Sequence, residues 1–388
     1  MAEVWHWLQD VTEHLRVARR RKALRAPGRG VDHAARWERV QAVTERLHPR
    51  RMRLRVVDVV QETPSAKTYR LVRTDGPLPP FRPGQYVNVL VDVDGVRTSR
   101  PYSIVSQPGE DLLELTVKDK PGGFVAPYLL NQVEAGDELE TTGPAGTFYH
   151  EPLIDGEDLV FLAGGSGMTP FMSIIRTMVC EGLPLKIHLL YGCRVPDDVI
   201  YGDELAAIAA GHPGLQLTLV ISEPPAGYAG PVGFLDAALI RDRVGDVAGK
   251  TFYVCGPSVM YDFCLEALEA LGVPRHKIKR ELYGPPANVT REPGWPAGLA
   301  PDTQFAVEVV GRQTIRATAG EPLLNTLERY GVVVPAMCRA GECSTCRVQL
   351  LAGRVFMPEH AGVREADRAN GYIHACVSYP LEDLRIRV

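Results

Sequence analysis

The sequence predicts a multidomain chain: a helical N-terminal extension, an antiparallel β-barrel, an α/β domain with a parallel sheet, and a small C-terminal domain. Three observations support this fold class. A length of 388 residues exceeds one ordinary domain and suits two or three. The hydrophobic pattern changes along the chain from helical spacing to short strands, and then to alternating strands and helices. Finally, a segment rich in proline and glycine, residues 285–304, is typical of a linker before the last domain.

The composition excludes several classes of protein. The chain is 45% hydrophobic and 23% charged, which suits packed cores and excludes a wholly disordered or fibrous protein. No window of about 18 apolar residues predicts a transmembrane helix. Glu3 and Asp10 interrupt the first apolar stretch, so no secretory signal is expected. Eight cysteines are too few for a disulfide scaffold of this length. We therefore expect a cytoplasmic protein.

Residues 1–50 form a basic extension. Residues 1–55 carry 14 Lys and Arg against 6 Asp and Glu, whereas the rest of the chain carries 29 against 41. Apolar side chains recur at helical spacing at Val4, Leu8, Val11 and Leu15. They predict one helix within residues 1–25, and a second is expected over residues 34–47. One interpretation is a solvated extension packed on the main body, and the other is an arm that docks an acidic partner or a membrane surface. The acidic remainder does not indicate nucleic-acid binding.

Residues 51–152 form the predicted barrel. Runs rich in β-branched residues are separated by Gly and Pro turn signals, as in a small antiparallel barrel; they lie at 53–57, 85–91, 103–105 and 112–117. The motif Arg100-Pro101-Tyr102-Ser103 suits a flavin, because an aromatic ring can stack on the isoalloxazine, a hydroxyl can reach its polar edge and an arginine can pair with a phosphate. The alternative is a barrel strand with a buried tyrosine.

Residues 153–284 form the predicted α/β domain. Strands alternate with helices, which implies a parallel sheet with helices on both faces; the strands are expected at 159–163, 185–191, 217–221 and 251–255. A glycine turn, residues 164–170, follows the first strand and opens a helix, whose N-terminal N–H groups can bind a pyrophosphate. The alternative is a tight strand-to-helix turn. Residues 255–257, Cys-Gly-Pro, end a later strand at the same edge of the sheet, which favours a nucleotide site there.

The C-terminal domain, residues 305–388, carries the strongest motif. Its cysteines are spaced C-x4-C-x2-C, with a fourth after 29 intervening residues; they are Cys338, Cys343, Cys346 and Cys376. This is the plant-type ferredoxin spacing, in which four thiolates hold a [2Fe–2S] cluster. Structural zinc is a rival, but it usually shows two C-x2-C pairs, and one is present here. Unligated core thiols are the third interpretation. Three of the other cysteines, Cys180, Cys193 and Cys264, are expected to be structural.

The three motifs together resemble a known family, the ferredoxin–NADP reductase-type flavoproteins fused to a C-terminal plant-type [2Fe–2S] ferredoxin domain. Reductase components of oxygenases that are similar to phthalate dioxygenase reductase have this domain order. The resemblance covers about residues 52–388 and leaves out the first 50 residues. It implies an α+β, ferredoxin-like β-grasp fold for residues 305–388. It also implies FAD, a [2Fe–2S] cluster and a nicotinamide nucleotide as cofactors.

The resemblance also implies site residues. The expected flavin-binding residues are Arg100, Pro101, Tyr102, Ser103, Gly122, Gly123, Phe124 and Val125. The expected nucleotide-binding residues are Gly164, Gly165, Gly167, Met168, Thr169, Pro170, Glu223, Cys255, Gly256, Pro257 and Met260. The four cysteines of the C-terminal domain are the expected metal ligands. Ser103, Cys255 and Tyr283 are the expected catalytic residues, beside the flavin's reactive nitrogen and the nicotinamide, with Tyr283 in the segment that ends the nucleotide domain.

Two departures from the family pattern affect the choice of cofactor. Ala126 stands where many relatives have serine, but backbone N–H groups remain available, so we expect FAD rather than FMN. Relatives that prefer NADPH often carry Ser-Arg where this chain has Ser222-Glu223. A carboxylate there repels a 2′-phosphate and accepts from a ribose hydroxyl, so we expect NADH rather than NADPH. Arg194 is the alternative residue for reading a phosphate.

The family resemblance implies a reaction. A hydride passes from NADH to the flavin, and single electrons then pass through the cluster to an external protein acceptor, such as an oxygenase or a desaturase. One alternative is a redox-responsive binding or sensor protein, although three electron-handling motifs in one chain argue against it. The other is a flavin reductase that acts directly on a small substrate. Because the chain has no spare domain for such a substrate, this alternative is disfavoured as well.

Overall fold

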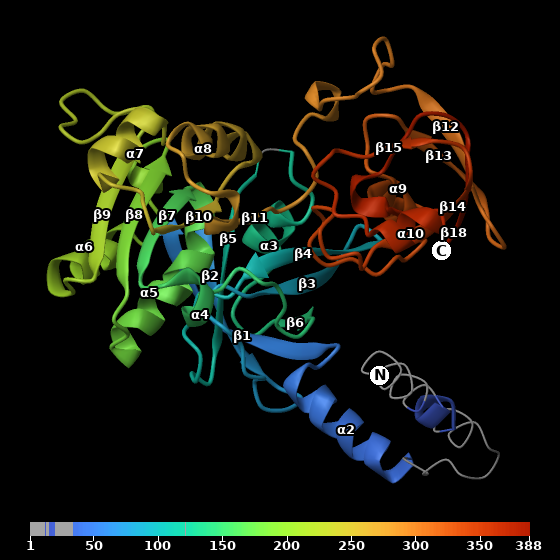
Figure 1. Ribbon diagram of the computed structural model, residues 1–388, viewed down its shortest axis with the longest axis horizontal. Coiled ribbons are helices and arrows are strands. Elements are labelled where there is room, and N and C mark those ends of the chain that lie inside the picture. The colour runs from blue at the N-terminus through green and yellow to red at the C-terminus, as the bar shows by residue number, and fades with distance from the viewer. Residues whose placement is uncertain (1–11, 13–14, 20–33, 121) are drawn as a thin grey trace, which may run out of the picture. The chain divides into compact units, whose positions relative to one another are not determined.

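The computed structural model describes residues 12, 15–19, 34–120 and 122–388 (Figure 1). The chain divides into two units, Met1–Pro49 and Arg50–Val388. In the first unit helix α2 spans Ala34–Leu47, where the sequence predicts a helix. The helix predicted within residues 1–25 is described only at residues 12 and 15–19, which are helical. Val4, Leu8 and Val11, on which that prediction rested, lie outside the described residues.

The second unit begins with a six-stranded antiparallel sheet in the order β4-β3-β6-β1-β2-β5. Its strands are β1 (Met52–Thr63), β2 (Ala66–Arg73), β3 (Tyr86–Val93), β4 (Val96–Ser103), β5 (Leu113–Lys118) and β6 (Glu138–Thr141). A single bridge between Ile104, just after β4, and Leu115 of β5 brings the two ends of this order together, while β4 itself remains an edge strand. Alternate residues of β3 (Val87, Val89 and Val91) point into the barrel core, as the period of a strand requires. Helix α3 (Ala126–Gln132) adds Leu129 to the same core.

The α/β domain follows, with five parallel strands in the order β11-β10-β7-β8-β9. They are β7 (Asp158–Gly164), β8 (Lys186–Cys193), β9 (Leu215–Ile221), β10 (Thr251–Cys255) and β11 (Ile278–Glu281). Four of these strands lie where the sequence predicts them. The fifth, β11, was not predicted, because Ile278-Lys279-Arg280-Glu281 has a single apolar residue and no alternation to read.

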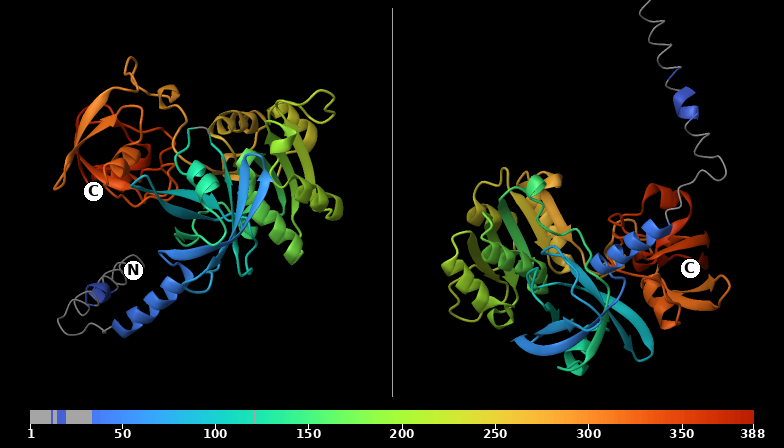
Figure 2. Two further views of the ribbon diagram at one scale, coloured as in Figure 1. Left: turned by 180° about the vertical axis from the view of Figure 1, so that it is seen from behind. Right: turned by 90° about the horizontal axis from the view of Figure 1, so that it is seen from below.

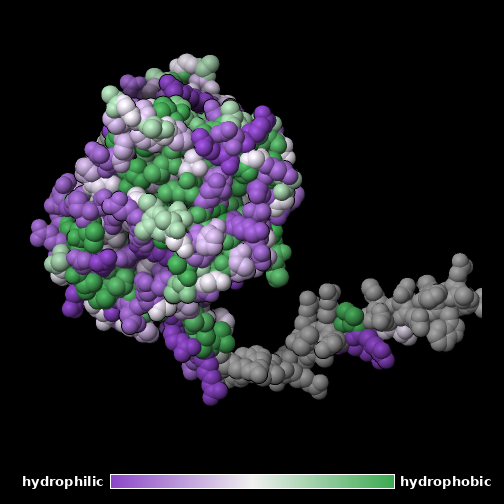
Figure 3. Space-filling model, turned by 90° about the vertical axis from the view of Figure 1, so that its left-hand side faces the viewer, coloured by the Kyte–Doolittle hydropathy of each residue, from purple (hydrophilic) through white to green (hydrophobic). Residues whose placement is uncertain are grey.

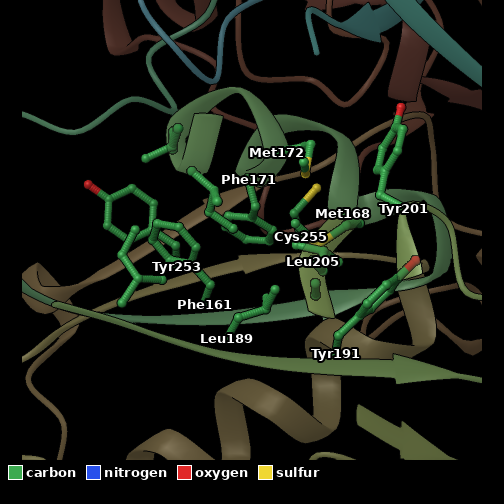
Figure 4. Packing of buried hydrophobic residues seen from close by; sticks show 14 of the residues in the cluster. Phe161, Met168, Phe171, Met172, Leu189, Tyr191, Tyr201, Leu205, Tyr253 and Cys255 are labelled. Carbon is green, nitrogen blue, oxygen red and sulfur yellow. The ribbon is translucent and has the colours of Figure 1, made fainter. Parts of the chain in front are cut away.

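Helices cover both faces of this parallel sheet (Figure 2). The short α4 (Pro152–Asp155) precedes the first strand, α5 (Thr169–Glu181) and α6 (Gly202–Gly211) pack on one face, and α7 (Ala237–Val244) and α8 (Ser258–Ala270) pack on the other. Aromatic rings fill the α5 side, where Phe161 stacks on Phe171 with 4.6 Å between ring centroids (Figure 4). A stacked pair of this kind contributes about 0.5–1.5 kcal/mol beyond the burial of its area.

The C-terminal domain is a mixed five-stranded sheet in the order β13-β12-β18-β14-β16, with a parallel pair, β12 and β18, inside it. The strands are β12 (Gln304–Val309), β13 (Thr314–Thr318), β14 (Arg347–Ala352), β16 (Tyr372–His374) and β18 (Leu384–Arg387), beside a small sheet of β15 (Val355–Phe356) and β17 (Tyr379–Pro380). Helix α9 (Leu323–Arg329) packs its leucines into the core of the sheet, and the short α10 (Glu365–Ala369) precedes β16. This is the α+β arrangement that the sequence implied.

The segment between the α/β domain and the C-terminal domain is anchored rather than free. Trp295 packs edge-on against Phe356 and Tyr379, with ring centroids 5.4 Å and 6.2 Å away. Val289 is 4% exposed in the same small cluster. The proline-rich composition suggested a spacer, but the tryptophan ties its second half to the domain that follows.

The surface offers no membrane-spanning element in the described ranges, since none of their helices combines sufficient length with sufficient apolarity. On the face that the α/β domain presents in Figure 3, hydrophilic and hydrophobic residues are interspersed.

Candidate functional site

The barrel and the α/β domain meet at a pair of hydroxyl groups. Ser103, the last residue of β4, lies with its Oγ 2.8 Å from the hydroxyl of Tyr283, which follows β11. The ring of Tyr86 meets Tyr283 edge-on at a centroid distance of 6.1 Å. Two of the three expected catalytic residues therefore touch, although 180 positions separate them in the chain.

The third, Cys255, lies close to this pair because of strand register. Cys255 ends β10 and is paired with Glu281, which ends the neighbouring strand β11. Burial raises the pKa of Cys255 well above its ordinary value, so the thiol stays protonated. The Glu281 carboxyl lies close enough to the Tyr283 hydroxyl for each group to shift the pKa of the other. The structure thus gathers Ser103, Tyr283, Glu281 and Cys255 at one point.

Glu281 was missed as a site residue, although the sequence segment Glu281-Leu282-Tyr283 contained the signal. Its side chain is 7% exposed, and its Oε2 has no hydrogen-bond partner. Burial raises the pKa of Glu281 to about 8, so the carboxyl is largely protonated at neutral pH. A buried carboxyl that keeps its proton near pH 7, beside a hydroxyl chain, can hold or donate a proton at this point.

The glycine turn after β7 packs against the turn after β10. A Cβ at Gly167 would lie 2.1 Å from the carbonyl oxygen of Cys255, and one at Gly164 would lie 2.5 Å from the sulfur of Met260. Both glycines are therefore needed for close packing of the two motifs. Gly165 differs, because it has a φ of +51° and open space where a Cβ would stand. Figure 4 shows Met168, from this turn, beside Cys255.

These turns lie at the carboxyl edge of the parallel strands, where such sheets bind ligands. Thr169 and Pro170 open helix α5 directly after the turn, and the Thr169 hydroxyl donates to the Ser166 carbonyl over 2.9 Å. Gly256 and Pro257 follow β10 and lead into α8. The structure brings the two predicted nucleotide motifs together, and Gly165 leaves its side of the turn open for an anion.

The two candidate residues for reading the ribose lie together at the ends of β8 and β9. The Glu223 carboxylate is 3.8 Å from the Arg194 guanidinium, and both side chains are more than 60% exposed. The Glu223 N–H donates to the Arg194 carbonyl over 2.8 Å, which fixes the two backbones together. From the sequence, Glu223 and Arg194 are alternative candidates for recognising the ribose or its phosphate. In the structure the two side chains form an ion pair.

The loop before α3 has an open glycine of its own. Gly122 has a φ of +69° with open space around it, whereas Gly123 is held close to the Lys120 carbonyl. Phe124 is 40% exposed and Val125 is buried. No side chain caps the N-terminus of α3, so its first N–H groups remain available for a phosphate oxygen. This loop and the arginine of β4 fit the pyrophosphate and phosphate groups of a flavin nucleotide.

The four cysteines of the C-terminal domain come together as two pairs. The thiols of Cys338 and Cys343 lie close enough to shift each other's pKa, and so do those of Cys346 and Cys376. The Cys338 thiol lowers the pKa of Cys343 to about 5, which favours a thiolate. In the described part of the chain, no three Cys, His, Asp or Glu side chains surround a single ion position. Two pairs fit the two irons of a [2Fe–2S] cluster better than one tetrahedral zinc.

The loop between the first two cysteines turns its backbone toward sulfur. The N–H groups of Ala340 and Cys343 both donate to the Cys338 sulfur over 3.4 Å. Gly341, at a φ of +83°, accepts a hydrogen bond at its carbonyl from the His374 ring over 2.7 Å. N–H groups aimed at a sulfur stabilise the negative charge of a thiolate-bound cluster.

Comparisons with known proteins match this architecture along the chain. Family models match as an oxidoreductase FAD-binding domain at residues 54–150, an oxidoreductase NAD-binding domain at residues 161–266, and a 2Fe-2S iron-sulfur cluster binding domain at residues 307–381.

Two curated relatives and one solved structure extend the match to whole chains. The glycine betaine monooxygenase reductase subunit of Pseudomonas aeruginosa is 31% identical over 86% of this chain and 94% of its own. The ferredoxin reductase component of the Mycobacterium tuberculosis 3-ketosteroid-9-alpha-monooxygenase is 30% identical over the same shares. The structure of phthalate dioxygenase reductase covers 87% of this chain and 98% of its own, with a TM-score of 0.64 and 22% identity, and thus shows a shared fold.

Proposed function

Because the chain belongs to the ferredoxin–NADP reductase-type flavoproteins with a fused C-terminal [2Fe–2S] ferredoxin domain, we propose that it is the reductase component that supplies an oxygenase with electrons. It is an NADH-dependent oxidoreductase whose cofactors are FAD, NADH and a [2Fe–2S] cluster. When bound, FAD accepts a two-electron hydride from NADH, and the cluster carries electrons one at a time. The observation that carries the proposal is the meeting of Ser103, Tyr283, Glu281 and Cys255 between the flavin and nucleotide domains.

The barrel residues bind the flavin in this proposal. Arg100 pairs with a flavin phosphate, since burial lowers the pKa of its guanidinium only to about 10 and leaves it charged at neutral pH. Pro101 and Tyr102 present a flat surface to the isoalloxazine, and Ser103 faces its polar edge. The N–H groups of Gly122, Phe124 and Val125, with the first turn of α3, would hold the pyrophosphate, while the Gly123 N–H closes the turn on the Lys120 carbonyl over 2.7 Å.

The α/β domain binds and orients NADH. The turn from Gly164 to Pro170 receives the pyrophosphate on the open side of Gly165, and Met168 closes its base against Cys255. Glu223 accepts from a ribose hydroxyl, held in place by Arg194. The run from Cys255 to Met260 borders the nicotinamide.

Three side chains orient the hydride donor and acceptor. The hydroxyl groups of Ser103 and Tyr283 are hydrogen-bonded to each other, which fixes both side chains. Cys255 contributes a small, uncharged side chain beside them. Glu281 keeps a proton that the hydroxyl chain can pass toward the flavin edge at Ser103. The four cysteines, which pair as Cys338 with Cys343 and Cys346 with Cys376, would supply the four thiolates that hold the cluster.

The acceptor is proposed from the relatives: both belong by name to monooxygenase systems, so we assign this chain an oxygenase as partner. We also assign it to a reducing compartment such as the cytoplasm, because all eight cysteines are free of disulfides and four of them are needed as thiolates.

The decisive experiment separates the two halves of the electron path. The purified chain should contain about two iron and two acid-labile sulfide atoms per chain. In Cys343→Ala, NADH should still reduce the flavin, measured as bleaching of its visible absorbance. Reduction of cytochrome c, a one-electron acceptor, should be lost. Cys180→Ala, which replaces an exposed cysteine outside the site, is the matched control and should retain both activities. Undiminished cytochrome c reduction in Cys343→Ala would overturn the proposal.

A further inference from the structure

The C-terminal domain packs against an edge strand of the barrel. Strand β4 ends the sheet order, and helix α9 lies beside it (Figure 1). Thr98 and Ser99 of β4 are 5% and 8% exposed, although they lie on an edge strand. This strand continues directly into the flavin motif that starts at Arg100, so the same element faces the C-terminal domain and carries the proposed flavin site.

The hydroxyl of Thr98 is the meeting point of this contact. It accepts hydrogen bonds from Arg100 Nη1 over 2.8 Å and from Arg339 Nη2 over 2.8 Å. It donates to Glu328 Oε2 over 3.0 Å. A threonine hydroxyl has one donor and two acceptor positions, so its entire hydrogen-bonding capacity is used. Of its three partners, one comes from the barrel and two come from the C-terminal domain.

The two partners in the C-terminal domain are a buried ion pair next to the cluster. Arg339 and Glu328 form a salt bridge and are 4% and 8% exposed. Arg339 directly follows the cluster ligand Cys338 and has a φ of +55°, while Glu328 lies on α9. Arg339 Nη1 also donates to Asn325 on the same helix over 3.2 Å. The start of the cluster loop is therefore tied to α9 and, through Thr98, to the barrel.

Charges this deeply buried are retained only where their partners satisfy them. Two arginines and one carboxylate share the site, where burial first and the charge of Arg339 second lower the pKa of Arg100. The Thr98 hydroxyl separates the two guanidinium groups while giving each an acceptor. Removing it would leave both without that acceptor and weaken the contact between the domains.

We propose that Thr98 is a positioning residue for electron transfer: together with Glu328 and Arg339, it fixes the cluster loop against the strand that carries the flavin motif. The proposal rests on the proposed function, in which one electron at a time leaves the flavin for the cluster. Electron tunnelling weakens steeply with distance, so a loosened contact slows this step. It leaves hydride transfer near wild type, because Ser103, Tyr283 and Cys255 do not contact Thr98. Arg100 Nη1 also keeps a second acceptor, the Ser99 carbonyl, over 2.8 Å.

The test uses the holoprotein and Thr98→Val, which keeps the shape of the side chain and removes its hydroxyl. Stopped-flow mixing with NADH follows flavin reduction first and cluster reduction second. We expect the rate of flavin reduction to stay within about twofold of wild type. The rate of cluster reduction should fall by roughly tenfold or more, since Arg100, Arg339 and Glu328 each lose a hydrogen bond to the Thr98 hydroxyl. Thr98→Ser should restore cluster reduction. Glu328→Gln, a second variant that keeps the barrel unaltered, should slow the same step.

Two further measurements separate positioning from a general loss of stability. The electron paramagnetic resonance spectrum of the reduced cluster should be unchanged in Thr98→Val, and hydrogen exchange should quicken in α9 and β4. Thr326→Val is the matched control: this buried threonine lies on α9, and its hydroxyl bonds Glu321 within the same domain. It should leave cluster reduction near wild type.

Three results would contradict the proposal. These are unchanged cluster reduction in Thr98→Val, equal slowing of flavin and cluster reduction, or equal effects of Thr98→Val and Thr326→Val. A wild-type chain that binds FAD and the cluster yet never reduces the cluster from NADH would instead contradict the proposed function. In that case, unchanged hydrogen exchange of α9 and β4 in Thr98→Val would show that Thr98 does not hold the two elements together, and would contradict the proposal as well.

Discussion

Glu281 shows how position alone gives a common side chain unusual chemistry. The carboxyl ends a parallel strand beside a buried thiol, and its surroundings are apolar enough to raise its pKa from 4.5 to about 8. Most glutamates at the end of a strand reach water and ionise. Here Tyr86, Tyr283 and Gly146 close around it, and the proton stays. The residue pattern of Glu281-Leu282-Tyr283 is visible in the sequence, but the desolvation is a property of the packed domains.

Glu281→Gln should remove a pH dependence of stability. Because the folded pKa of Glu281 lies above its unfolded value, its contribution is fully present below about pH 4.5 and is lost as pH rises through 8. Between pH 6 and pH 9 wild type should therefore lose roughly 2 kcal/mol more unfolding free energy than Glu281→Gln. Urea unfolding of both proteins at the two pH values measures the difference. Parallel pH profiles would show that Glu281 ionises normally.

Glu223→Ala should shift the cofactor preference through Arg194. The carboxylate now lies 3.8 Å from the guanidinium, and its removal frees that arginine to pair with a 2′-phosphate. We expect the ratio of kcat/KM for NADPH to that for NADH to rise by roughly tenfold, the effect of about one charge-assisted hydrogen bond. The double variant Glu223→Ala with Arg194→Ala should lose this gain. A wild-type preference for NADPH would contradict the assignment.

At the scale of elements, the sequence predicts what has a local cause. The strands β7 to β10 appear in the sequence as short apolar runs between turns. The turn after β7 is predicted by its glycines. Strand β11 has no such run, since it is an edge strand whose polar side chains face outward or toward partners. The contact of Thr98 with Glu328 joins residues 230 positions apart. The spacing of apolar residues along the chain does not predict a contact between two such distant residues. Motifs therefore supply candidate site residues from the sequence, and these remain predictions, whereas Glu281 and Arg339 have surroundings that only the tertiary contacts reveal.

The close approach of Gly167 to Cys255 gives a prediction about the packing of the turns after β7 and β10. Gly167→Ala places a methyl group against the Cys255 carbonyl, so the turns after β7 and β10 must separate. We expect a loss of unfolding free energy of roughly 2 kcal/mol or more, typical of overpacking in a core. Gly165→Ala, which adds a methyl group in open space, should cost about 1–2 kcal/mol from its left-handed backbone alone. Thermal unfolding of both variants makes the comparison, and an equal or smaller loss in Gly167→Ala would refute the close packing.

At the scale of the whole molecule, the basic segment Met1–Pro49 forms one unit and the residues with the redox motifs belong to the other. The family match begins after it, at residue 54, and α2 exposes Trp37, Val40 and Val43. Cationic segments of this kind raise the rate at which an acidic partner is met, and salt weakens the effect as the screening length falls to about 8 Å.

Deleting residues 1–50 should therefore leave the intrinsic chemistry intact. Flavin content, iron content and NADH-dependent ferricyanide reduction should stay near wild type. Electron delivery to the oxygenase should fall at low salt, and the deficit should shrink at high salt, because the intact chain also loses its electrostatic attraction. Turnover of the reconstituted system across a salt series measures this. A truncated chain that loses flavin or unfolds several degrees lower would show instead that the extension supports the fold.

The cover that the C-terminal domain provides for β4 has a consequence for aggregation. An edge strand with bare N–H and C=O groups is a template for pairing with another molecule, and here α9 and the cluster loop shield it. A chain cut after residue 284 would keep both nucleotide-binding domains but present β4 to solvent. Such a fragment should self-associate edge to edge, visible as light scattering that grows with concentration. Light scattering of the fragment that stays flat with concentration would show that β4 needs no such cover.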